Sequence, residues 1–558
     1  MAGPGRLRIS SGLIFCTALL FIDPSHAYIN SGLPAQRHRA WLEDMTGQIL
    51  ATSVGDLTPE MLEAAPQVMS AWADNPFDAQ PSKSSTTNNN APTMAVERLM
   101  KRLVAEQTAT GNADAANTYA YNALLHGWAR SGEGEYAAQR AEQILIEMQD
   151  RYAAGNASVQ PNTASFRSVL LAWERASSSS TSTTNKHHDA THAAQRGQRI
   201  LEWMVSLHEA DVNELAKPTS ECFDIVMKAW CQSNHADAPK IVEELLVRME
   251  QLYREGNAEV QPQTRHYNHV LRAWQQSKQK GSARRAEEIL EHMNKLSSLD
   301  DSPIQPNFDS YNACITAWAT SDENCSARKA ESVLRKMESA YKDDHSNDVQ
   351  PDAVMYNLVI DAWAKVSSHA KTNGRLPYES ARKMLDRQID LYEQHGAIKC
   401  RPDAYGYTSV IKACESMAVR SKRQREKAFK IAERTFLELC SSDHAAPNHV
   451  AYGTMLKACA HLLAPGSKQR EQISRLVFDK ACRDGCVGAM VLNRFREAAS
   501  SASYKEVMGD FNKNSLPYDW AFRVPKSDQV LHRRKRKKKG AVQKKLPSKI
   551  NKKTDLKP

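Results

Sequence analysis

The sequence predicts an all-α protein, an α-solenoid built from helix–turn–helix repeats. Three observations support this prediction. An aromatic residue followed seven positions later by Trp or Cys recurs eight times, at spacings of 45, 57, 44, 44, 45, 51 and 45 residues. A second amphipathic pattern follows each first one, and a proline then precedes the next copy. The aromatic residues are Tyr121, Phe166, Phe223, Tyr267, Tyr311, Tyr356, Tyr407 and Tyr452.

The first segment of each repeat has the periodicity of an amphipathic helix. The third, fourth and seventh residues after the aromatic residue are mostly apolar, which places them on one helix face. The seventh residue always follows Gly or Ala. Aromatic side chains can stack on nucleic acid bases, but Cys could not serve as such a platform, so we expect this position to belong to the packed core. The eight residues are Trp128, Trp173, Trp230, Trp274, Trp318, Trp363, Cys414 and Cys459.

The second segment of each repeat is also helical, and a proline follows the loop behind it. Residues 141–148, 285–293, 329–337 and 430–439 are examples of this second helix. Proline restricts the residue before it to extended conformations, so each proline is expected to separate two repeats. A helix pair with one apolar face cannot bury that face alone, and stacking of neighbours completes the core. The prolines are Pro161, Pro218, Pro262, Pro306, Pro351, Pro402 and Pro447.

The repeats define the expected domain boundaries. We predict about eight repeats over residues 118–490 and a C-terminal cap over residues 491–531. Residues 59–117 are interpreted as a degenerate N-terminal capping repeat, because they repeat both helix patterns in a weaker form. Within it, residues 81–90 are rich in Ser, Thr and Asn, which predicts a disordered insertion. A similar insertion at residues 177–185 accounts for the spacing of 57.

The N-terminus has the features of a targeting leader. Two arginines precede the apolar residues 13–22, and small residues around position 27 form a signal peptidase site. Residues 1–27 are therefore predicted to be a signal peptide, and residues 28–58 a transit or linker segment. Tyr28 directly after the cleavage site resembles the bipartite leader of algae with secondary plastids, which implies a plastid location. A mitochondrial leader and an ordinary secretory signal are the alternatives.

The basic charge of the chain is concentrated at its C-terminus. The formal net charge is +10, but residues 532–558 contain thirteen Lys and Arg residues and one Asp, which is +12. The rest of the chain therefore sums to −2. Such a dense cationic run is expected to be disordered and to bind polyanions without sequence preference. A nuclear localisation signal, a solubility function and ribosome contact are alternative interpretations of this tail.

Several classes of protein and site are disfavoured by the sequence. Mean hydropathy is −0.58 and no apolar run approaches the roughly 18 residues of a membrane-spanning helix, so no membrane partner is expected. Cys482 and Cys486 lack a second pair of ligands nearby, so no metal site is expected. A deaminase signature, a P-loop and a dinucleotide fingerprint are absent. We therefore expect no catalytic residues, no cofactor and no enzymatic activity.

The repeats resemble those of the pentatricopeptide repeat family. The resemblance rests on the Tyr-Asn pair that opens the first helix and on the Pro-Asp or Pro-Asn pair before the next repeat, and it covers residues 118–490. It implies a right-handed α-solenoid that binds single-stranded RNA in an organelle, one base to a repeat. The repeats are longer than the roughly 35 residues typical of the family. That family also places an aliphatic wedge two residues before the aromatic position, which Val354 and Val450 match.

The resemblance also implies which residues read the bases. The family uses the residue after the aromatic position together with the residue after the closing proline. Amides and short acids at these positions can bond to the Watson–Crick edge of an unstacked base. Arg167 with Thr219 and Asp224 with Gln263 occupy the same positions but fall outside the usual combinations. The predicted RNA-binding pairs are Asn122 with Asn162, Asn268 with Asn307, Asn312 with Asp352, Asn357 with Asp403, and Thr408 with Asn448.

Two functions follow from these patterns. The first is an organellar protein that binds single-stranded RNA and acts in RNA processing, stability or translation, with other RNA-processing proteins or the ribosome as further partners. By the resemblance, repeats four to seven would read a pyrimidine, uracil, uracil and adenine. The alternative is a tetratricopeptide-like scaffold that binds a peptide, which the charge of −2 outside the tail favours. A capping function for Asn at helix starts is a purely structural alternative for the reading residues.

Overall fold

A computed structural model describes most of the chain between residues 35 and 525. The described residues are 35–74, 91–112, 114–179, 186–277, 279–299, 302–344, 347–366, 376–419, 421–509 and 517–525. They contain 21 α-helices and no strand, which confirms the predicted all-α class. The predicted signal peptide, the insertion at residues 81–90 and the basic tail at 532–558 lie outside the described residues.

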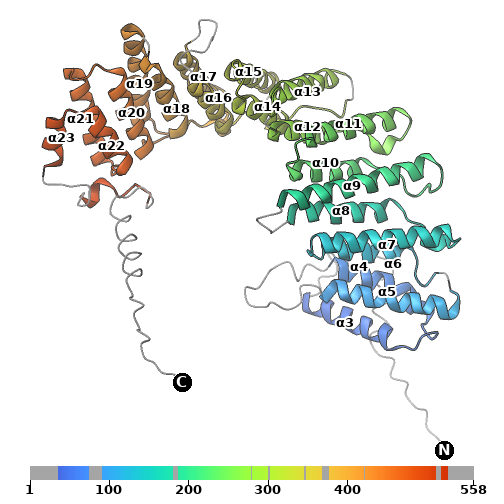
Figure 1. The fold of residues 1–558 in the computed structure, drawn as a ribbon. Coiled ribbons are helices and arrows are strands. Elements are labelled where there is room, and N and C mark those ends of the chain that lie inside the picture. The colour runs from blue at the N-terminus through green and yellow to red at the C-terminus, as the bar shows by residue number, and fades with distance from the viewer. Residues whose placement is uncertain are drawn as a thin grey trace, which may run out of the picture. The chain divides into compact units, whose positions relative to one another are not determined.

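The chain divides into two compact units, residues 1–277 and 278–558, and each is described by itself. In each unit, successive helices pack as antiparallel pairs (Figure 1). The first unit contains α3 (Ala35–Ala51), α4 (Pro59–Ala73), α5 (Ala91–Thr110), α6 (Thr118–Arg130), α7 (Glu135–Ala153), α8 (Thr163–Ser179), α9 (Lys186–Glu209), α10 (Ser220–Ser233), α11 (Ala238–Arg254) and α12 (Thr264–Gln276).

The second unit continues the same alternation of helices. It contains α13 (Ser282–Ser297), α14 (Phe308–Thr320), α15 (Ser326–Asp344), α16 (Ala353–Lys365), α17 (Pro377–His395), α18 (Ala404–Glu415), α19 (Lys422–Ser441), α20 (His449–Leu462), α21 (Lys468–Arg483), α22 (Ala489–Ala498) and α23 (Ser501–Met508). In order along the chain, helices α6 to α21 alternate as the first and second helices of the eight predicted repeats. The predicted end of the repeats at residue 490 falls inside α22.

Each first helix begins where the proline rule places it. The residue after the proline is extended, and in α14, α16, α18 and α20 its side chain accepts a hydrogen bond of 2.8–3.2 Å from the third helical N–H. Asn117 caps α6 in the same way. A single 3₁₀ turn, absent from our sequence prediction, precedes four of these prolines. The turns are η2 (Ala157–Val159), η3 (Ala258–Val260), η4 (Asn347–Val349) and η5 (Ile398–Cys400).

The repeated aromatic residues form the core, as predicted. Five of the six repeat tryptophans are at most 4% exposed, and Cys414 and Cys459 are fully buried, whereas Trp274 is only partly buried. The indole N–H also links neighbouring pairs. Trp173 donates to Glu142 on α7 at 3.1 Å, and Trp363 donates to Glu331 on α15 at 3.1 Å. Apolar burial and this recurring hydrogen bond thus stack each first helix on the preceding second helix.

The N-terminal segment departs from the prediction. Residues 28–58 were expected to be a transit or linker segment, yet residues 35–51 form α3, which packs on α4 and α5. Leu42 and Ile49 are fully buried, and Trp72 on α4 donates a 2.9 Å hydrogen bond to Thr46. The spacing of residues 42, 46 and 49 places them on one helix face. This face, which covers the first pair, explains why the segment folds.

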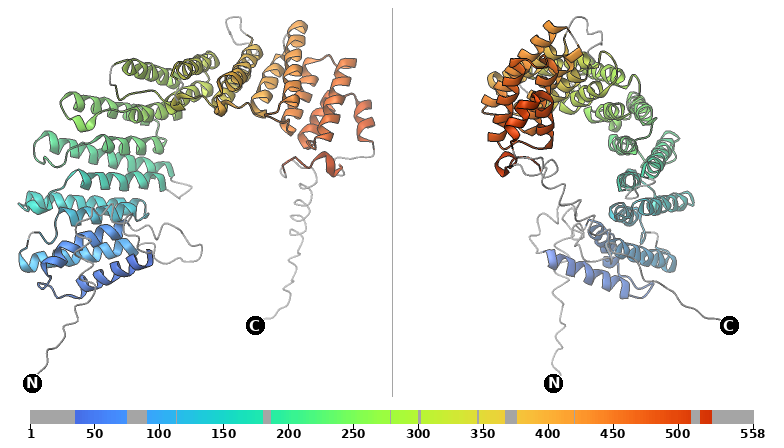
Figure 2. Two further views of the ribbon diagram at one scale, coloured as in Figure 1. Left: turned by 180° about the vertical axis from the view of Figure 1, so that it is seen from behind. Right: turned by 60° about the vertical axis from the view of Figure 1, so that its left-hand side comes forward.

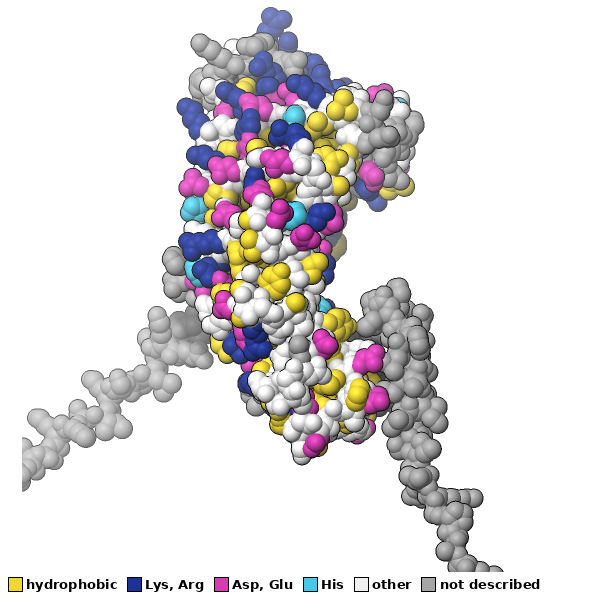
Figure 3. Space-filling model, turned by 90° about the vertical axis from the view of Figure 1, so that its right-hand side faces the viewer, with side chains coloured by type: hydrophobic (Ala, Val, Ile, Leu, Met, Phe, Trp, Pro, Cys, Tyr) yellow, Lys and Arg dark blue, Asp and Glu magenta, His cyan; other side chains and the backbone are white. Residues whose placement is uncertain are grey.

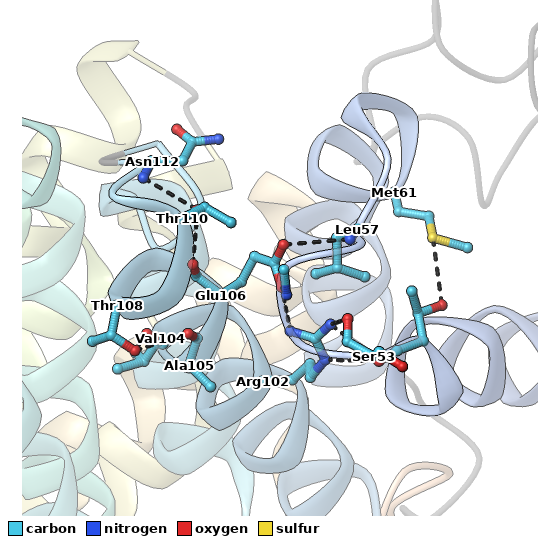
Figure 4. A network of polar contacts seen from close by, with 12 residues as sticks. Ser53, Leu57, Met61, Arg102, Val104, Ala105, Glu106, Thr108, Thr110 and Asn112 are labelled. Carbon is cyan, nitrogen blue, oxygen red and sulfur yellow. Dashed lines mark hydrogen bonds and ion pairs between the residues drawn. The ribbon is translucent and has the colours of Figure 1, made fainter.

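A buried ion pair fixes the turn between α3 and α4 (Figure 4). Arg102 donates to Glu106 at 2.7 Å, and both side chains are less than a tenth exposed. Glu106 also accepts from the backbone N–H groups of Gly55 and Leu57, while Arg102 donates to the carbonyl of Ser53. Burial raises the pKa of Glu106, but these hydrogen bonds outweigh it and hold the pKa below its usual value. The carboxylate therefore stays charged and caps the turn.

The C-terminal helices close the end of the second unit. α22 packs on α20 and α21, and the rings of Phe478 and Phe495 stack with centroids 4.1 Å apart. The 3₁₀ turn η7 (Tyr518–Trp520) returns to α21, where Trp520 lies edge-on to Phe478. Its carbonyl accepts a 2.6 Å hydrogen bond from the backbone N–H of Val487. These contacts cover the apolar face of the last pair.

Candidate nucleic-acid interface

The predicted reading residues lie along the first helices of the pairs. Within each unit these helices contact one another in order, α4 to α12 in the first unit and α14 to α20 in the second (Figure 2). The first residue of each reading pair lies in the second turn of its helix. The second residue lies at the start of the next first helix. Repetition of the pairs therefore places the reading positions in a row along each unit.

The structure brings Asn122 and Asn162 into direct contact. The Nδ2 atom of Asn122 donates to Oδ1 of Asn162 at 3.1 Å. Ser165 joins the pair, because its hydroxyl donates to Oδ1 of Asn122 at 2.6 Å and accepts from the backbone N–H of Asn162 at 3.1 Å. Both amides are partly exposed, whereas Ser165 is fully buried. Two side chains from adjacent repeats thus form one polar group.

Asn357 and Asp403 form a similar contact in the second unit. The Nδ2 atom of Asn357 donates to both carboxylate oxygens of Asp403, at 3.1 and 3.0 Å. Asp403 is exposed and also caps α18 by accepting from the N–H of Gly406 at 3.0 Å. Asn357 is only 7% exposed, and its buried Oδ1 has no partner among the described contacts. The accessible group of this pair is therefore the carboxylate rather than the amide.

Asn312 with Asp352 and Thr408 with Asn448 are not joined by a described hydrogen bond. Asn312 is partly buried and accepts from Thr316 at 3.4 Å, and Asp352 caps α16. The hydroxyl of Thr408 donates to the carbonyl of Ala404, one turn earlier on its own helix. The remaining predicted residues are Asn448, an exposed cap of α20, and Asn268 on α12 with Asn307 before α14, which belong to different units.

Capping accounts for only one residue of each pair. Asn162, Asp352, Asp403 and Asn448 each accept a backbone N–H at a helix start, so their residue type has a structural explanation. Asn122 and Asn357, in contrast, are the fifth residues of their helices and cap nothing. These two residues instead donate to the capping residue of the next repeat, Asn162 and Asp403 respectively.

Exposed apolar side chains accompany the reading positions. Val354 is 60% exposed and Val450 is 38% exposed, each two residues before the buried aromatic position. The same place holds Tyr119, 44% exposed, and Tyr405, 56% exposed, which our sequence analysis missed. Their position two residues before Tyr121 and Tyr407 was the signal that could have identified them. A tyrosine ring at this place offers a larger stacking surface than valine.

Ion pairs occupy the reading positions of the second and third repeats. Arg167 donates to Glu221 at 2.9 Å, and Asp224 contacts His269 at 2.9 Å. Burial raises the pKa of Asp224, but the hydrogen bond and charge of His269 outweigh it and lower the pKa overall. Arg167, Glu221 and Asp224 line a groove of about 690 Å³ over α8 and α10, together with Glu174 and its partner Lys228. Basic and acidic side chains line this groove in equal number.

Outside these first helices, the described residues contain few other candidate functional sites. Within the described residues, no cluster of three His, Cys, Asp or Glu side chains could hold a metal ion. No helix in the described part of the chain is long and apolar enough to cross a membrane. On the face of the molecule shown in Figure 3, acidic, basic and hydrophobic side chains are interspersed. The row of amides and short acids remains the most distinctive polar feature.

Comparison with known proteins bears on these repeats. Residues 254–321 match the family model of a pentatricopeptide repeat domain. The match covers the end of α11 and all of α12, α13 and α14, so it confirms the predicted pentatricopeptide resemblance for this segment. The same alternation of helices extends on both sides of it, from α6 to α21. No curated protein matches the chain.

Proposed function

We propose that the protein binds single-stranded RNA through the row of reading positions on its first helices. The observation that carries this proposal is the contact between Asn357 and Asp403, which presents an oriented carboxylate beside an exposed apolar residue. A carboxylate accepts hydrogen bonds, and the N3–H of uracil can donate one. The apolar side chains at Val354 and Tyr405 would separate and stack neighbouring bases.

The proposed biological role requires the protein to bind RNA but not to catalyse a reaction on it. A protein that occupies a single-stranded segment can protect it, expose a neighbouring segment or guide processing proteins and the ribosome. We propose no enzymatic activity and no cofactor. The leader features at residues 1–27 support action in a plastid, with the mitochondrion as the alternative. The basic tail would add contacts to phosphates that do not depend on sequence.

Selection from randomised single-stranded RNA tests this function. The full chain is incubated with the pool at two salt concentrations, and the bound RNA is sequenced. We expect an enriched element of pyrimidine, uracil, uracil and adenine. Enrichment should persist at the higher salt concentration, because base contacts depend less on ionic strength than phosphate contacts do. Binding that shows no base preference would contradict the proposed reading function.

Alanine substitutions then test the named residues. Asn312→Ala removes a proposed base contact, and Asn357→Ala removes the amide that orients the Asp403 carboxylate. Each change should weaken binding to the enriched element by about tenfold. Asn294→Ala is the control, because Asn294 lies on α13 and contacts Leu290 and Tyr311 within the stack. Its RNA affinity should stay within twofold of the original chain. Equal effects of all three changes would indicate a general loss of folding.

A peptide-binding scaffold is a second candidate, and the groove over α8 and α10 favours it. The reading positions there are already engaged in ion pairs, and a peptide with charges of both signs could exchange with them. Arg167→Glu reverses the charge of one partner in the ion pair with Glu221. If the groove binds a peptide, this change should abolish peptide capture and leave RNA selection unchanged. If RNA enrichment is lost with this change, the groove belongs to the RNA-binding surface instead.

A further inference from the structure

The buried residue Ser165 lies at a position that no base-reading pair includes. It is the third residue of α8, one turn before Ser168, and it belongs to the repeat after Asn122. Its hydroxyl accepts from the backbone N–H of Asn162, so its one hydrogen is available to donate, and the acceptor at 2.6 Å is Oδ1 of Asn122. Ser165 therefore determines which end of the Asn122 amide faces it.

The amide of Asn162 is fixed separately, because its Oδ1 accepts the backbone N–H of Ser165 at 3.1 Å and also lies 3.2 Å from the Ser165 hydroxyl. With its oxygen turned to Ser165, Asn122 directs Nδ2 to Oδ1 of Asn162, which also accepts the backbone N–H of Ser165. The oxygen atoms of both amides are thus engaged within the group. One hydrogen on Nδ2 of Asn122 and both hydrogens of the partly exposed Asn162 amide have no partner in the described structure. The pair accordingly offers donors.

The sixth repeat shows the opposite arrangement. A carboxylate can only accept, so Asp403 alone forces Nδ2 of Asn357 toward itself. The place of Ser165 is taken by Gly406, where a side chain would be excluded because a Cβ atom would lie 2.7 Å from Oδ1 of Asn357. The exposed group is the carboxylate, which offers acceptors. No hydroxyl is needed where the acid already fixes the orientation.

We propose that Ser165 is a specificity-determining residue that makes the Asn122–Asn162 pair select cytosine over uracil. The proposal rests on the proposed RNA-binding function. The Watson–Crick edge of cytosine carries two adjacent acceptors, N3 and O2, which match the donors of this pair. Uracil instead presents its N3–H donor at the same place, facing the amide hydrogens. Ser165 does not contact the base in this arrangement and acts through Asn122 as a positioning residue.

Ser165→Ala provides the test, because alanine already occupies this helix position at Ala120 and Ala451, where the backbone cap is intact. RNA selection is performed with the full chain and with this variant. The original chain should prefer cytosine to uracil about tenfold at one further position of the bound RNA, outside the four bases assigned to repeats four to seven. In the variant the oxygen of the Asn122 amide loses the hydroxyl that holds it, and only the contact of Nδ2 with Asn162 still orients the amide. The preference should therefore fall to twofold or less, with the other positions unchanged.

Two further variants show which base position is affected and whether the effect belongs to the Ser165 hydroxyl. Asn162→Asp identifies the position, since a carboxylate there should convert the preference to uracil. Ser168→Ala removes a hydroxyl from the same helix that bonds only to the carbonyl of Ala164, and it should keep the cytosine preference. Thermal unfolding of Ser165→Ala within a few degrees of the original chain confirms that the variant is folded.

The outcomes separate this inference from the function on which it rests. If Ser165→Ala keeps the cytosine preference, or if the original chain selects uracil at the position that Asn162→Asp identifies, Ser165 does not set specificity. RNA reading by the other repeats would stand in either case. If the original chain enriches no element at all, the proposed function itself fails.

Discussion

At the residue scale, the third residue of three first helices, α8, α12 and α14, accepts the same backbone hydrogen bond through different side chains. Ser165 and Ser310 each accept the backbone N–H three residues earlier through the hydroxyl. His266 does the same through Nδ1, which accepts from Gln263 at 3.0 Å, while Nε2 contacts the carbonyl of Ser220 at 3.1 Å. This geometry requires a neutral imidazole with its hydrogen on Nε2, because a second hydrogen would face the Gln263 donor.

The neutral state of His266 predicts a pH dependence of stability. Burial lowers its pKa from 6.5 to about 4, so the unfolded chain binds the proton more readily than the folded chain. The stabilisation is complete above about pH 6.5 and is lost as the pH falls toward 4, by roughly 3 kcal/mol in total. His266→Ser retains an acceptor but does not titrate. Urea unfolding at pH 7 and pH 4.5 should show a smaller pH effect in this variant.

The repeat tryptophans allow a matched comparison. The indole N–H of Trp173 donates to Glu142, whereas the buried N–H of Trp318 has no partner among the described contacts. Trp→Phe removes a hydrogen bond at residue 173 but removes an unsatisfied donor at residue 318. Trp173→Phe should therefore cost about 1–2 kcal/mol more unfolding free energy than Trp318→Phe. Equal losses in chemical denaturation would show that the N–H contributes nothing at either place.

At the element scale, the repeat pattern predicted the helices because local signals and packing agree. Each Pro-Asn or Pro-Asp pair specifies a helix start, and the apolar face specifies what that helix buries. The family resemblance, applied to these repeats, paired Asn357 with Asp403, and the two side chains are in contact. The ion pair of Arg167 with Glu221 could not be predicted, because the two residues are 54 positions apart and the spacing of these repeats varies. Helix α3 was missed because its face is buried only against α4 and α5.

The fit between α16 and α18 depends on a glycine within α18. A Cβ atom at Gly406 would lie 2.7 Å from Oδ1 of Asn357, so Gly406→Ala should displace that amide and cost about 1–3 kcal/mol of unfolding free energy. Gly197→Ala on α9 is the control, since its Cβ would meet its nearest neighbours at 3.9 Å. Thermal denaturation should show that this second change is neutral or stabilising, because alanine favours helix formation.

At the scale of the whole molecule, charge is divided between two parts of the chain. Residues 1–531 sum to −2, and residues 532–558 carry +12. In the described part, several cations are already paired with carboxylates, including Lys228 with Glu174 and Lys412 with Asp361. Under the proposed function, the stacked helices would contact bases and the tail would contact phosphates, so affinity and sequence preference should respond to different substitutions.

Removing the positive charge of the tail tests whether base contacts and phosphate contacts are made by different parts of the chain. Replacing the seven basic residues 533–539 by Ser in the full chain should weaken binding to all single-stranded RNA sequences alike. The slope of log affinity against log salt should become shallower by about 0.7 for each phosphate contact that is lost. The enriched element should remain the same. A changed element would mean that the tail contributes to base selection.

The caps at the two ends of the described fold determine how the molecule behaves toward its own copies. An uncovered helix pair exposes the surface on which the next pair would stack, and a second molecule carries the matching surface at its opposite end. Such a head-to-tail contact does not close on itself and would propagate into fibres. Because α22 and the Trp520 turn cover the last pair and α3 covers the first, these two stacking surfaces are occupied within the chain itself, which disfavours such a contact.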